Sequence, residues 1–251
     1  METGLAGRVV LVTGGGGGAG PTIVEAFAAE GAAVAVNYRS SASRAEAVAE
    51  AVRARGGRAI AVAADLGSTE EVAAMMTRVE AELGSVAVLV TATSAYRNDR
   101  LTEIDDGAWS SVVDDLLGAT FRTCRAVVPG MQAAGFGRIV NVAARSGLVG
   151  VARAAHYASA KAAIVGLTAS LAKELGPQGI LVNAVAPTQI VTEKDGTPSI
   201  PEDRQADMAK SIPVRRLASP ADLAGLVVWL GSAANTYVSG QTITLSGGAQ
   251  S

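Results

Sequence analysis

Cysteine, histidine and aromatic residues are scarce in this sequence. One cysteine, Cys124, and one histidine, His156, occur among 251 residues, and aromatic side chains make up 4% of the chain. A single cysteine excludes an internal disulfide and is typical of a reducing compartment. Cys124 has apolar neighbours and is predicted to be a buried core thiol. We predict no metal site.

A strong net charge and long apolar runs are also missing. The formal net charge is −2 and no long basic run occurs, so composition gives no support for binding to nucleic acid or to a membrane surface. The longest apolar run, around residues 226–230, is too short to span a bilayer. The first seven residues lack the apolar core of a signal peptide, and we therefore expect a cytoplasmic protein.

Apolar residues are plentiful, at 49% of the chain, and a chain of 251 residues favours one large domain over two small ones. Continuous β-branched runs alternate with alanine-rich stretches, which predicts a single α/β domain over 1–251 with a doubly wound parallel sheet flanked by helices. The expected strands are 8–13, 33–37, 58–63, 86–91, 138–143, 180–186 and 241–245. The expected helices are 19–30, 43–55, 69–83, 106–134, 155–175 and 220–231.

Residues 188–213 interrupt this alternation, because they are polar and charged and contain three prolines. A loop of this length inside a compact domain is usually functional. It follows the sixth strand at the carboxyl edge of the sheet, where open α/β folds bind ligands. We predict a substrate lid over 188–213, with a solvated insertion as the alternative.

A glycine-rich loop follows the first strand and opens the first helix. Gly14, Gly18 and Gly20 belong to the run from Thr13 to Gly20. Glycines allow a tight turn and close approach to a pyrophosphate, whose charge then lies at the helix N-terminus. Pro21 suits the first helical turn. This strand–loop–helix context predicts a Rossmann-like dinucleotide site.

The end of the second strand indicates which dinucleotide is bound. A carboxylate there would bind the ribose hydroxyls of NAD, whereas an arginine accommodates a 2′-phosphate. The chain has no carboxylate at this point and instead carries Arg39 followed by Ser40 and Ser41. Arg39 and Ser40 therefore favour NADP(H) over NAD(H).

Tyr157 and Lys161 are spaced four residues apart, which places both on one face of a helix. A lysine ammonium favours the phenolate, so we expect Lys161 to lower the pKa of Tyr157 toward neutrality. Tyr157 is then a proton donor and acceptor for a substrate oxygen. His156 precedes Tyr157 directly and faces elsewhere on the helix, which favours a packing or subunit-contact role.

Together these motifs resemble the short-chain dehydrogenase/reductase family over essentially the whole chain. The glycine loop resembles the family's cofactor loop, and Tyr157 with Lys161 resembles its catalytic pair. The resemblance implies that Asp65 and Leu66 contact adenine. It also implies that the segment of Pro187 and Thr192 lies beside the nicotinamide.

The family activity is hydride transfer between nicotinamide C4 and a carbonyl or alcohol carbon of a small molecule. By resemblance, Tyr157 would exchange a proton with the substrate oxygen, and Lys161 would bind the nicotinamide ribose. The resemblance also implies a homo-oligomer, a tetramer or a dimer, built on helices 106–134 and 155–175.

The sequence departs from the family pattern mainly on the substrate side. Ala144 stands at the family's catalytic serine, Leu116 at its asparagine, and Thr188 at the glycine that usually follows Pro187. The Asn-Asn-Ala-Gly that usually ends the fourth strand is replaced by Thr91, Ala92, Thr93 and Ser94. In the glycine loop, Gly16 and Gly17 replace a serine and a basic residue, which leaves Arg39 alone for the 2′-phosphate.

These departures leave alternatives open. Candidate pocket-lining groups at the carboxyl edge are Thr93, Ser94, Tyr96, Thr188 and Gln189, whereas the Ser146 hydroxyl is expected to bond to the backbone of its loop. The first hypothesis is an NADP(H)-dependent reductase or dehydrogenase with an incomplete catalytic set. The second keeps the fold but uses Tyr157 as the base of an elimination, isomerisation or cyclisation. The third is a non-catalytic NADP-binding partner.

Overall fold

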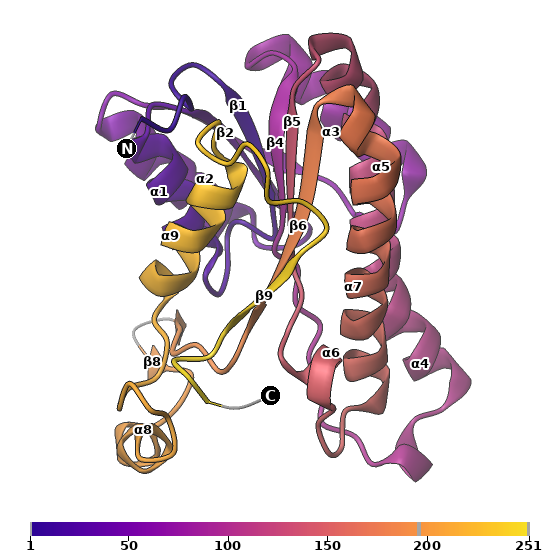
Figure 1. Ribbon diagram of the computed structural model, residues 1–251, viewed down its shortest axis with the longest axis vertical. Coiled ribbons are helices and arrows are strands. Elements are labelled where there is room, and N and C mark those ends of the chain that lie inside the picture. The colour runs from indigo at the N-terminus through magenta and orange to yellow at the C-terminus, as the bar shows by residue number, and fades with distance from the viewer. Residues whose placement is uncertain (1, 195–196, 250–251) are drawn as a thin grey trace.

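A seven-stranded parallel sheet forms the centre of the molecule (Figure 1). The computed structural model describes residues 2–194 and 197–249. The strand order is β3-β2-β1-β4-β5-β6-β9, which places a reversal of connection between β1 and β4. The strands are β1 (Val9–Thr13), β2 (Ala33–Tyr38), β3 (Arg58–Ala63), β4 (Val86–Thr91), β5 (Gly137–Val142), β6 (Ile180–Pro187) and β9 (Thr242–Leu245). The predicted fold is confirmed.

Both faces of the sheet are buried, because alternate residues of each strand pack against opposite helical layers. In β1, Val10 and Val12 join the core beneath α1, α2 and α9, whereas Val9 and Leu11 join the core beneath α3, α5 and α7. The two layers lie on opposite sides of the sheet in Figure 1. The helices are α1 (Gly20–Ala29), α2 (Ala42–Ala54), α3 (Thr69–Glu82), α5 (Ala119–Ala134), α7 (Ala155–Leu175) and α9 (Pro220–Gly231).

The long helix predicted over 106–134 contains an irregular turn at its middle. Its first part is α4 (Asp106–Val113), followed by a π turn, η2 (Asp114–Gly118), and then α5. A π turn accommodates an extra residue and rotates the side chains on either side of it relative to a regular helix. Shorter elements are η1 (Leu101–Glu103), α6 (Ser146–Val149) and η3 (Gly176–Gln178).

The segment 188–213 is more ordered than the expected loop. It contains a short antiparallel pair, β7 (Glu193–Lys194) with β8 (Thr197–Pro198), and a helix, α8 (Glu202–Ala209). Residues 195–196 lie outside the described part of the chain. None of the α8 residues is buried, so the helix has no apolar stripe from which the sequence could have revealed it.

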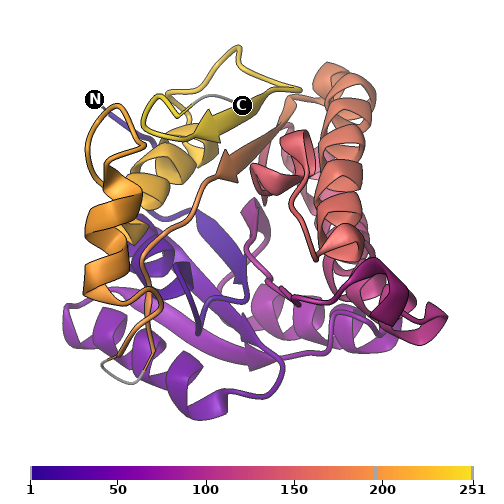
Figure 2. The same cartoon turned by 90° about the horizontal axis from the view of Figure 1, so that it is seen from below.

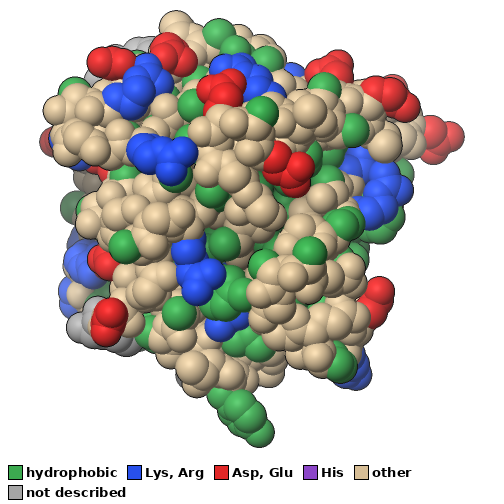
Figure 3. Space-filling view, turned by 90° about the horizontal axis from the view of Figure 1, so that it is seen from above, with side chains coloured by type: hydrophobic (Ala, Val, Ile, Leu, Met, Phe, Trp, Pro, Cys, Tyr) green, Lys and Arg blue, Asp and Glu red, His purple; other side chains and the backbone are tan. Residues whose placement is uncertain are grey.

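Figure 2 looks onto the carboxyl ends of the strands, which lie between two flanking parts of the chain. The segment 188–213 lies on one side of the view and α7 on the other. Figure 3 shows the opposite end of the molecule, where acidic and basic side chains are interspersed among the described residues. Within residues 2–194 and 197–249, no helix is both long enough and apolar enough to cross a membrane.

Candidate active site

A cavity of about 580 Å³ lies at the carboxyl edge of the sheet. It reaches the point between β1 and β4 where the strand order reverses, which is where open α/β sheets bind ligands. All residues predicted to bind a cofactor or to act in catalysis line it. They are Gly14, Gly18, Gly20, Arg39, Ser40, Asp65, Leu66, Tyr157, Lys161, Pro187 and Thr192. Their individual roles stay predictions.

The glycine loop is shaped by steric constraints at both ends. Gly14 has a φ of +65°, and a Cβ built on it would lie 3.0 Å from the carbonyl oxygen of Ala92. A Cβ on Gly20 would lie 2.6 Å from the carbonyl oxygen of Gly14, so a larger residue would force the loop open. Pro21 follows at the start of α1. The backbone of the loop and the N-terminus of α1 therefore border the cavity directly, as an anion-binding turn requires.

Two charged residues that the sequence did not single out lie at the end of the cavity where β2 ends. Arg44, on α2, lines the cavity and donates a hydrogen bond from Nη2 to the Ser41 hydroxyl at 3.0 Å. Asp115, in the π turn, lines the cavity and pairs with Arg39, with 2.8 Å between Oδ1 and Nη1. Arg44 lies five residues after Arg39, and this closeness in the sequence could have suggested a second basic residue at the site. No sequence signal indicates where the Asp115 side chain points.

Asp65 has local hydrogen bonds that fix the loop after β3. Its side chain accepts a hydrogen bond from the backbone N–H of Gly67 at 2.9 Å, and its own N–H donates to Glu71 at 2.7 Å. Ser68 caps α3 by accepting from the N–H of Glu71 at 3.1 Å. The loop that carries Asp65 and Leu66 therefore has a defined shape at the cavity wall.

Lys161 is buried at the other end of the cavity, with 3% of its surface exposed. Its Nζ donates hydrogen bonds to the carbonyl oxygens of Val142 at 2.7 Å and Thr93 at 3.4 Å. Burial lowers the pKa of the Lys161 ammonium from 10.5 to about 8. The Nζ lies 5.9 Å from the centroid of the Tyr157 ring.

The pKa of Tyr157 moves in the direction opposite to our expectation. Burial raises it from 10.0 to about 12, and the neighbouring Tyr96 adds to the rise. The main cause is desolvation, which disfavours the charged phenolate. The Tyr157 hydroxyl in this structure is therefore protonated at neutral pH, the state in which it can donate a proton.

Apolar side chains occupy the family's serine and asparagine positions. Ala144, 9% exposed, lines the cavity after β5. Leu116 is fully buried in a cluster with Val112 and Ala160, against which Tyr157 packs. A leucine in such a cluster holds the Tyr157 ring by contact but offers no polar atom for a water molecule.

The remaining polar groups near the strand ends have different surroundings. The Thr91 hydroxyl donates to the buried Asn141 at 3.0 Å, and Asn141 donates to Thr168 at 2.9 Å, so Thr91 belongs to an internal network. Thr93, Ser94 and Thr188 line the cavity. Buried Cys124 has a pKa raised to about 12 by desolvation and lies 3.9 Å from the Asn141 oxygen.

His156 and Ser146 are not among the described residues that line the cavity. The imidazole of His156 is fully buried, and its Nε2 lies 3.3 Å from Oδ2 of Asp99 on the segment after β4. This contact agrees with a packing role for His156. Ser146 is the first residue of α6.

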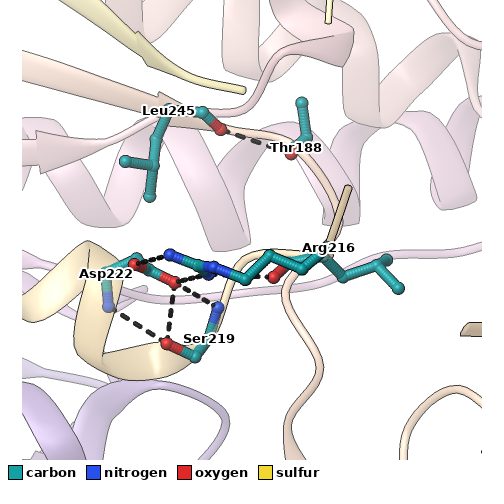
Figure 4. Close-up of polar contacts among 6 residues, drawn as sticks. Thr188, Arg216, Ser219, Asp222 and Leu245 are labelled. Atoms are coloured by element: carbon teal, nitrogen blue, oxygen red, sulfur yellow. Dashed lines mark hydrogen bonds and ion pairs between the residues drawn. The ribbon is translucent and has the colours of Figure 1, made fainter. Parts of the chain in front are cut away.

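The segment 188–213 is fixed to the domain at both ends, as the close-up in Figure 4 shows. At its start, the Thr188 hydroxyl donates to the carbonyl oxygen of Leu245 at 3.3 Å. Just beyond its end, Arg216 pairs with Asp222 at 2.6 and 2.8 Å, and Asp222 forms a capping box with Ser219 at the start of α9. The lid role of this segment stays a prediction.

Comparisons with known proteins agree with this architecture. A family model described as enoyl-(acyl carrier protein) reductase matches residues 16–250. The 3-oxoacyl-[acyl-carrier-protein] reductase FabG of Staphylococcus aureus strain Mu50 is 37% identical over 241 residues, which cover 96% of this chain and 97% of the relative. Nodulation protein G of Azospirillum brasilense is 34% identical over 241 residues, with the same coverage of 96% and 97%.

A solved structure is similar over almost the full length. It is a putative gluconate dehydrogenase from Agrobacterium tumefaciens, with a TM-score of 0.92 and 30% identity over 99% of this chain and 98% of that one. The family model matches from the glycine loop to beyond the last strand. The chain therefore belongs to the short-chain dehydrogenase/reductase family of oxidoreductases.

Proposed function

We propose that this protein is an NADP(H)-dependent oxidoreductase that reduces a carbonyl group, or oxidises the corresponding alcohol, by hydride transfer. The observation that carries the proposal is the placement of Tyr157 and Lys161 in one cavity with the glycine loop. Gly14 and Gly20 line the cavity, and a Cβ on either would press against a backbone carbonyl oxygen. Arg39 and Arg44 lie where a 2′-phosphate would be recognised.

In this proposal Tyr157 is the acid in the reducing direction. When bound, the nicotinamide supplies the hydride at C4, and negative charge develops on the substrate oxygen. The Tyr157 hydroxyl gives its proton to that oxygen, and Lys161 stabilises the phenolate that remains. Lys161 also binds the ribose on the nicotinamide side. In the oxidising direction the proton moves back to Tyr157.

The binding part of this proposal is tested with purified protein. NADPH and NADH are titrated separately by their fluorescence, and the proposal expects the tighter binding for NADPH. Absence of binding by either dinucleotide would contradict the cofactor assignment and the activity together.

The catalytic part is tested with a carbonyl panel, followed by the loss of NADPH absorbance. The panel includes a 3-oxoacyl thioester and a keto sugar acid, because relatives carry the names 3-oxoacyl-[acyl-carrier-protein] reductase and putative gluconate dehydrogenase. Tyr157→Phe serves as the inactive control. Tight NADPH binding with no turnover on any carbonyl would reject the redox reaction.

Ala144 and Leu116 favour a second candidate with the same cofactor site. Neither residue can donate a hydrogen bond to a substrate oxygen, and loss of one such donor costs roughly 10²–10³ in turnover. Losses within one catalytic unit need not add. Tyr157 would then act as the base in an elimination, isomerisation or cyclisation. Product formation without net NADPH consumption distinguishes this candidate, and a non-catalytic binding partner would form no product at all.

We also propose that the protein forms a homo-oligomer, a tetramer or a dimer. The outer face of the long helix supports this, because Trp109 and Phe121 are 41% and 46% exposed and border a shallow depression there. Analytical ultracentrifugation of the wild type and of Phe121→Asp tests the proposal. A monomeric wild type would contradict it.

A further inference from the structure

Asp115 places a carboxylate in the same cavity as the arginine that is predicted to bind a 2′-phosphate. Arg39 follows β2, whereas Asp115 comes from the π turn between α4 and α5, and the two residues are far apart in the sequence. Their side chains meet at 2.8 Å, and both line the cavity. A role of this pair in cofactor recognition rests on the proposed dinucleotide function.

Asp115 faces the cavity from the π turn, and adjacent helical residues do not share a face. Its neighbour Asp114 points to the outside of the helix, where it pairs with Arg122 at 2.7 Å and borders the shallow depression near Trp109. The two adjacent carboxylates therefore make ion pairs of nearly equal length with different arginines. Of these two neighbours, Asp115 lines the cavity and Asp114 does not.

The Arg39–Asp115 pair changes the electrostatics of phosphate recognition. Asp115 occupies Nη1 of the Arg39 guanidinium, so a 2′-phosphate must either share the guanidinium with this carboxylate or displace it. The side chains are 59% and 31% exposed, and an ion pair this open to water is weak enough to exchange. After the exchange, however, the Asp115 carboxylate still lies close to the incoming phosphate and repels it.

We propose that Asp115 is a cofactor-specificity residue, which holds Arg39 and reduces the preference of the site for a 2′-phosphorylated dinucleotide. A 2′-hydroxyl carries no charge and leaves the Arg39–Asp115 pair intact. The energetic cost of Asp115 therefore falls on NADP(H) and spares NAD(H). The wild-type protein consequently has a weaker preference for NADP(H) over NAD(H) than its arginines alone would give.

The test compares two adenosine probes that differ in the 2′-phosphate alone, adenosine 2′,5′-bisphosphate and adenosine 5′-monophosphate. Binding is measured by calorimetry for the wild type, Asp115→Asn and the matched control Asp114→Asn. We expect Asp115→Asn to tighten the bisphosphate about tenfold, equal to about 1.4 kcal/mol, and the monophosphate less than about twofold. Asp114→Asn changes neither affinity, because its carboxylate lies outside the cavity.

Further variants separate the direct effect from a general change in folding. Asp115→Ser should reproduce the gain of Asp115→Asn, and thermal unfolding of each variant shows that the domain is intact. In the background of Arg39→Gln, the gain from Asp115→Asn should shrink to less than about threefold, since no guanidinium is released. NADPH and NADH titrations should follow the bisphosphate and the monophosphate, respectively.

Three outcomes decide the matter. Equal tightening of both probes, or no difference between Asp115→Asn and Asp114→Asn, overturns the inference. If Arg39→Gln weakens NADPH while Asp115→Asn changes nothing, the inference fails and the proposed function stands. If neither dinucleotide binds to the wild type or to Asp115→Asn, the proposed function fails and the inference fails with it.

Discussion

The ring of Tyr96 meets the ring of Tyr157 edge to face, with centroids 5.2 Å apart and planes inclined by 82°. Tyr96 belongs to the segment after β4 and is 54% exposed. Such a pair contributes about 0.5–1.5 kcal/mol beyond its buried area, and here it limits the positions open to the Tyr157 ring. Tyr96 also helps to raise the pKa of Tyr157, after burial.

We expect Tyr96→Ala to lower kcat about tenfold, because the Tyr157 hydroxyl loses its fixed position relative to the substrate. Tyr96→Phe keeps the ring contact and should retain kcat within about twofold. It also removes the phenol that raises the pKa of Tyr157, so the basic limb of the kcat/KM profile should move to lower pH. Equal losses in both variants would show that the hydroxyl, and not the ring, matters.

Tyr157→Phe should reduce kcat by at least about 10²-fold, since the substrate oxygen loses its proton donor. NADPH binding and the unfolding temperature should stay close to those of the wild type, because the phenyl ring still packs against the Leu116 cluster. Steady-state kinetics and fluorescence titration on one preparation check both points. A variant that keeps full activity would reject Tyr157 as the acid.

Ala144→Ser restores a hydroxyl to the cavity wall beside Tyr157. If a missing hydrogen-bond donor limits carbonyl reduction, kcat should rise by roughly 10²–10³ on the carbonyl panel. Ala144→Val adds bulk without a donor and serves as the control. No gain from the serine, with NADPH binding unchanged, would indicate that this cavity carries out a reaction other than carbonyl reduction.

Lys161 should give the ligand-free protein a distinctive dependence of stability on pH. Its pKa falls from 10.5 to about 8 on burial, so within this window the unfolded chain binds a proton that the folded chain lacks. The free energy of unfolding therefore rises with pH between these values, by up to about 3 kcal/mol. Urea unfolding across this range should show the rise in the wild type and not in Lys161→Met. Parallel pH curves for the two proteins would contradict the prediction.

The Arg216–Asp222 contact should stabilise the start of α9 and the end of the 188–213 segment. Asp222→Asn weakens the capping box and the ion pair, and we expect a loss of about 1–2 kcal/mol in unfolding free energy. Asp207→Asn is the control, because the Asp207–Lys210 pair is exposed and should contribute little.

The pH dependence of this stabilisation has a definite sign. Arg216 and Ser219 hold the pKa of Asp222 well below its ordinary value of 3.8. The contribution is therefore complete above that value and is lost as the pH falls further. Urea unfolding at neutral pH and acid unfolding monitored by circular dichroism measure both effects. Identical losses in Asp222→Asn and Asp207→Asn would reject the anchoring role.

The sheet could be predicted from the sequence because each strand is a short β-branched run between turn residues. All seven strands of the sheet begin and end within one residue of the predicted bounds. Helix α8 was not predictable, since its residues are all partly or fully exposed and three prolines flank or precede it. Its stability depends on the surrounding segment and not on a periodic apolar face.

The site shows the same division between local pattern and tertiary context. The glycine loop and the Tyr157–Lys161 spacing are local patterns, and the structure brings them together in one cavity. The pairing of Asp115 with Arg39, 76 residues away in the sequence, is a tertiary contact that no local pattern indicates. The pKa of Tyr157 depends on how deeply the folded chain buries it, which spacing to Lys161 does not reveal.

The long helix packs against different elements before and after the π turn. Residues before it, in α4, pack against α7, whereas residues after it, in α5, pack against β4 and β5. One additional residue in an α-helix shifts every following side chain by about 100° around the axis. Deleting a single residue from η2 would remove the extra residue and leave a regular helix, whereas a deletion within α5 would turn the following side chains away from β4 and β5. The π turn is therefore the point at which this helix tolerates a change of length.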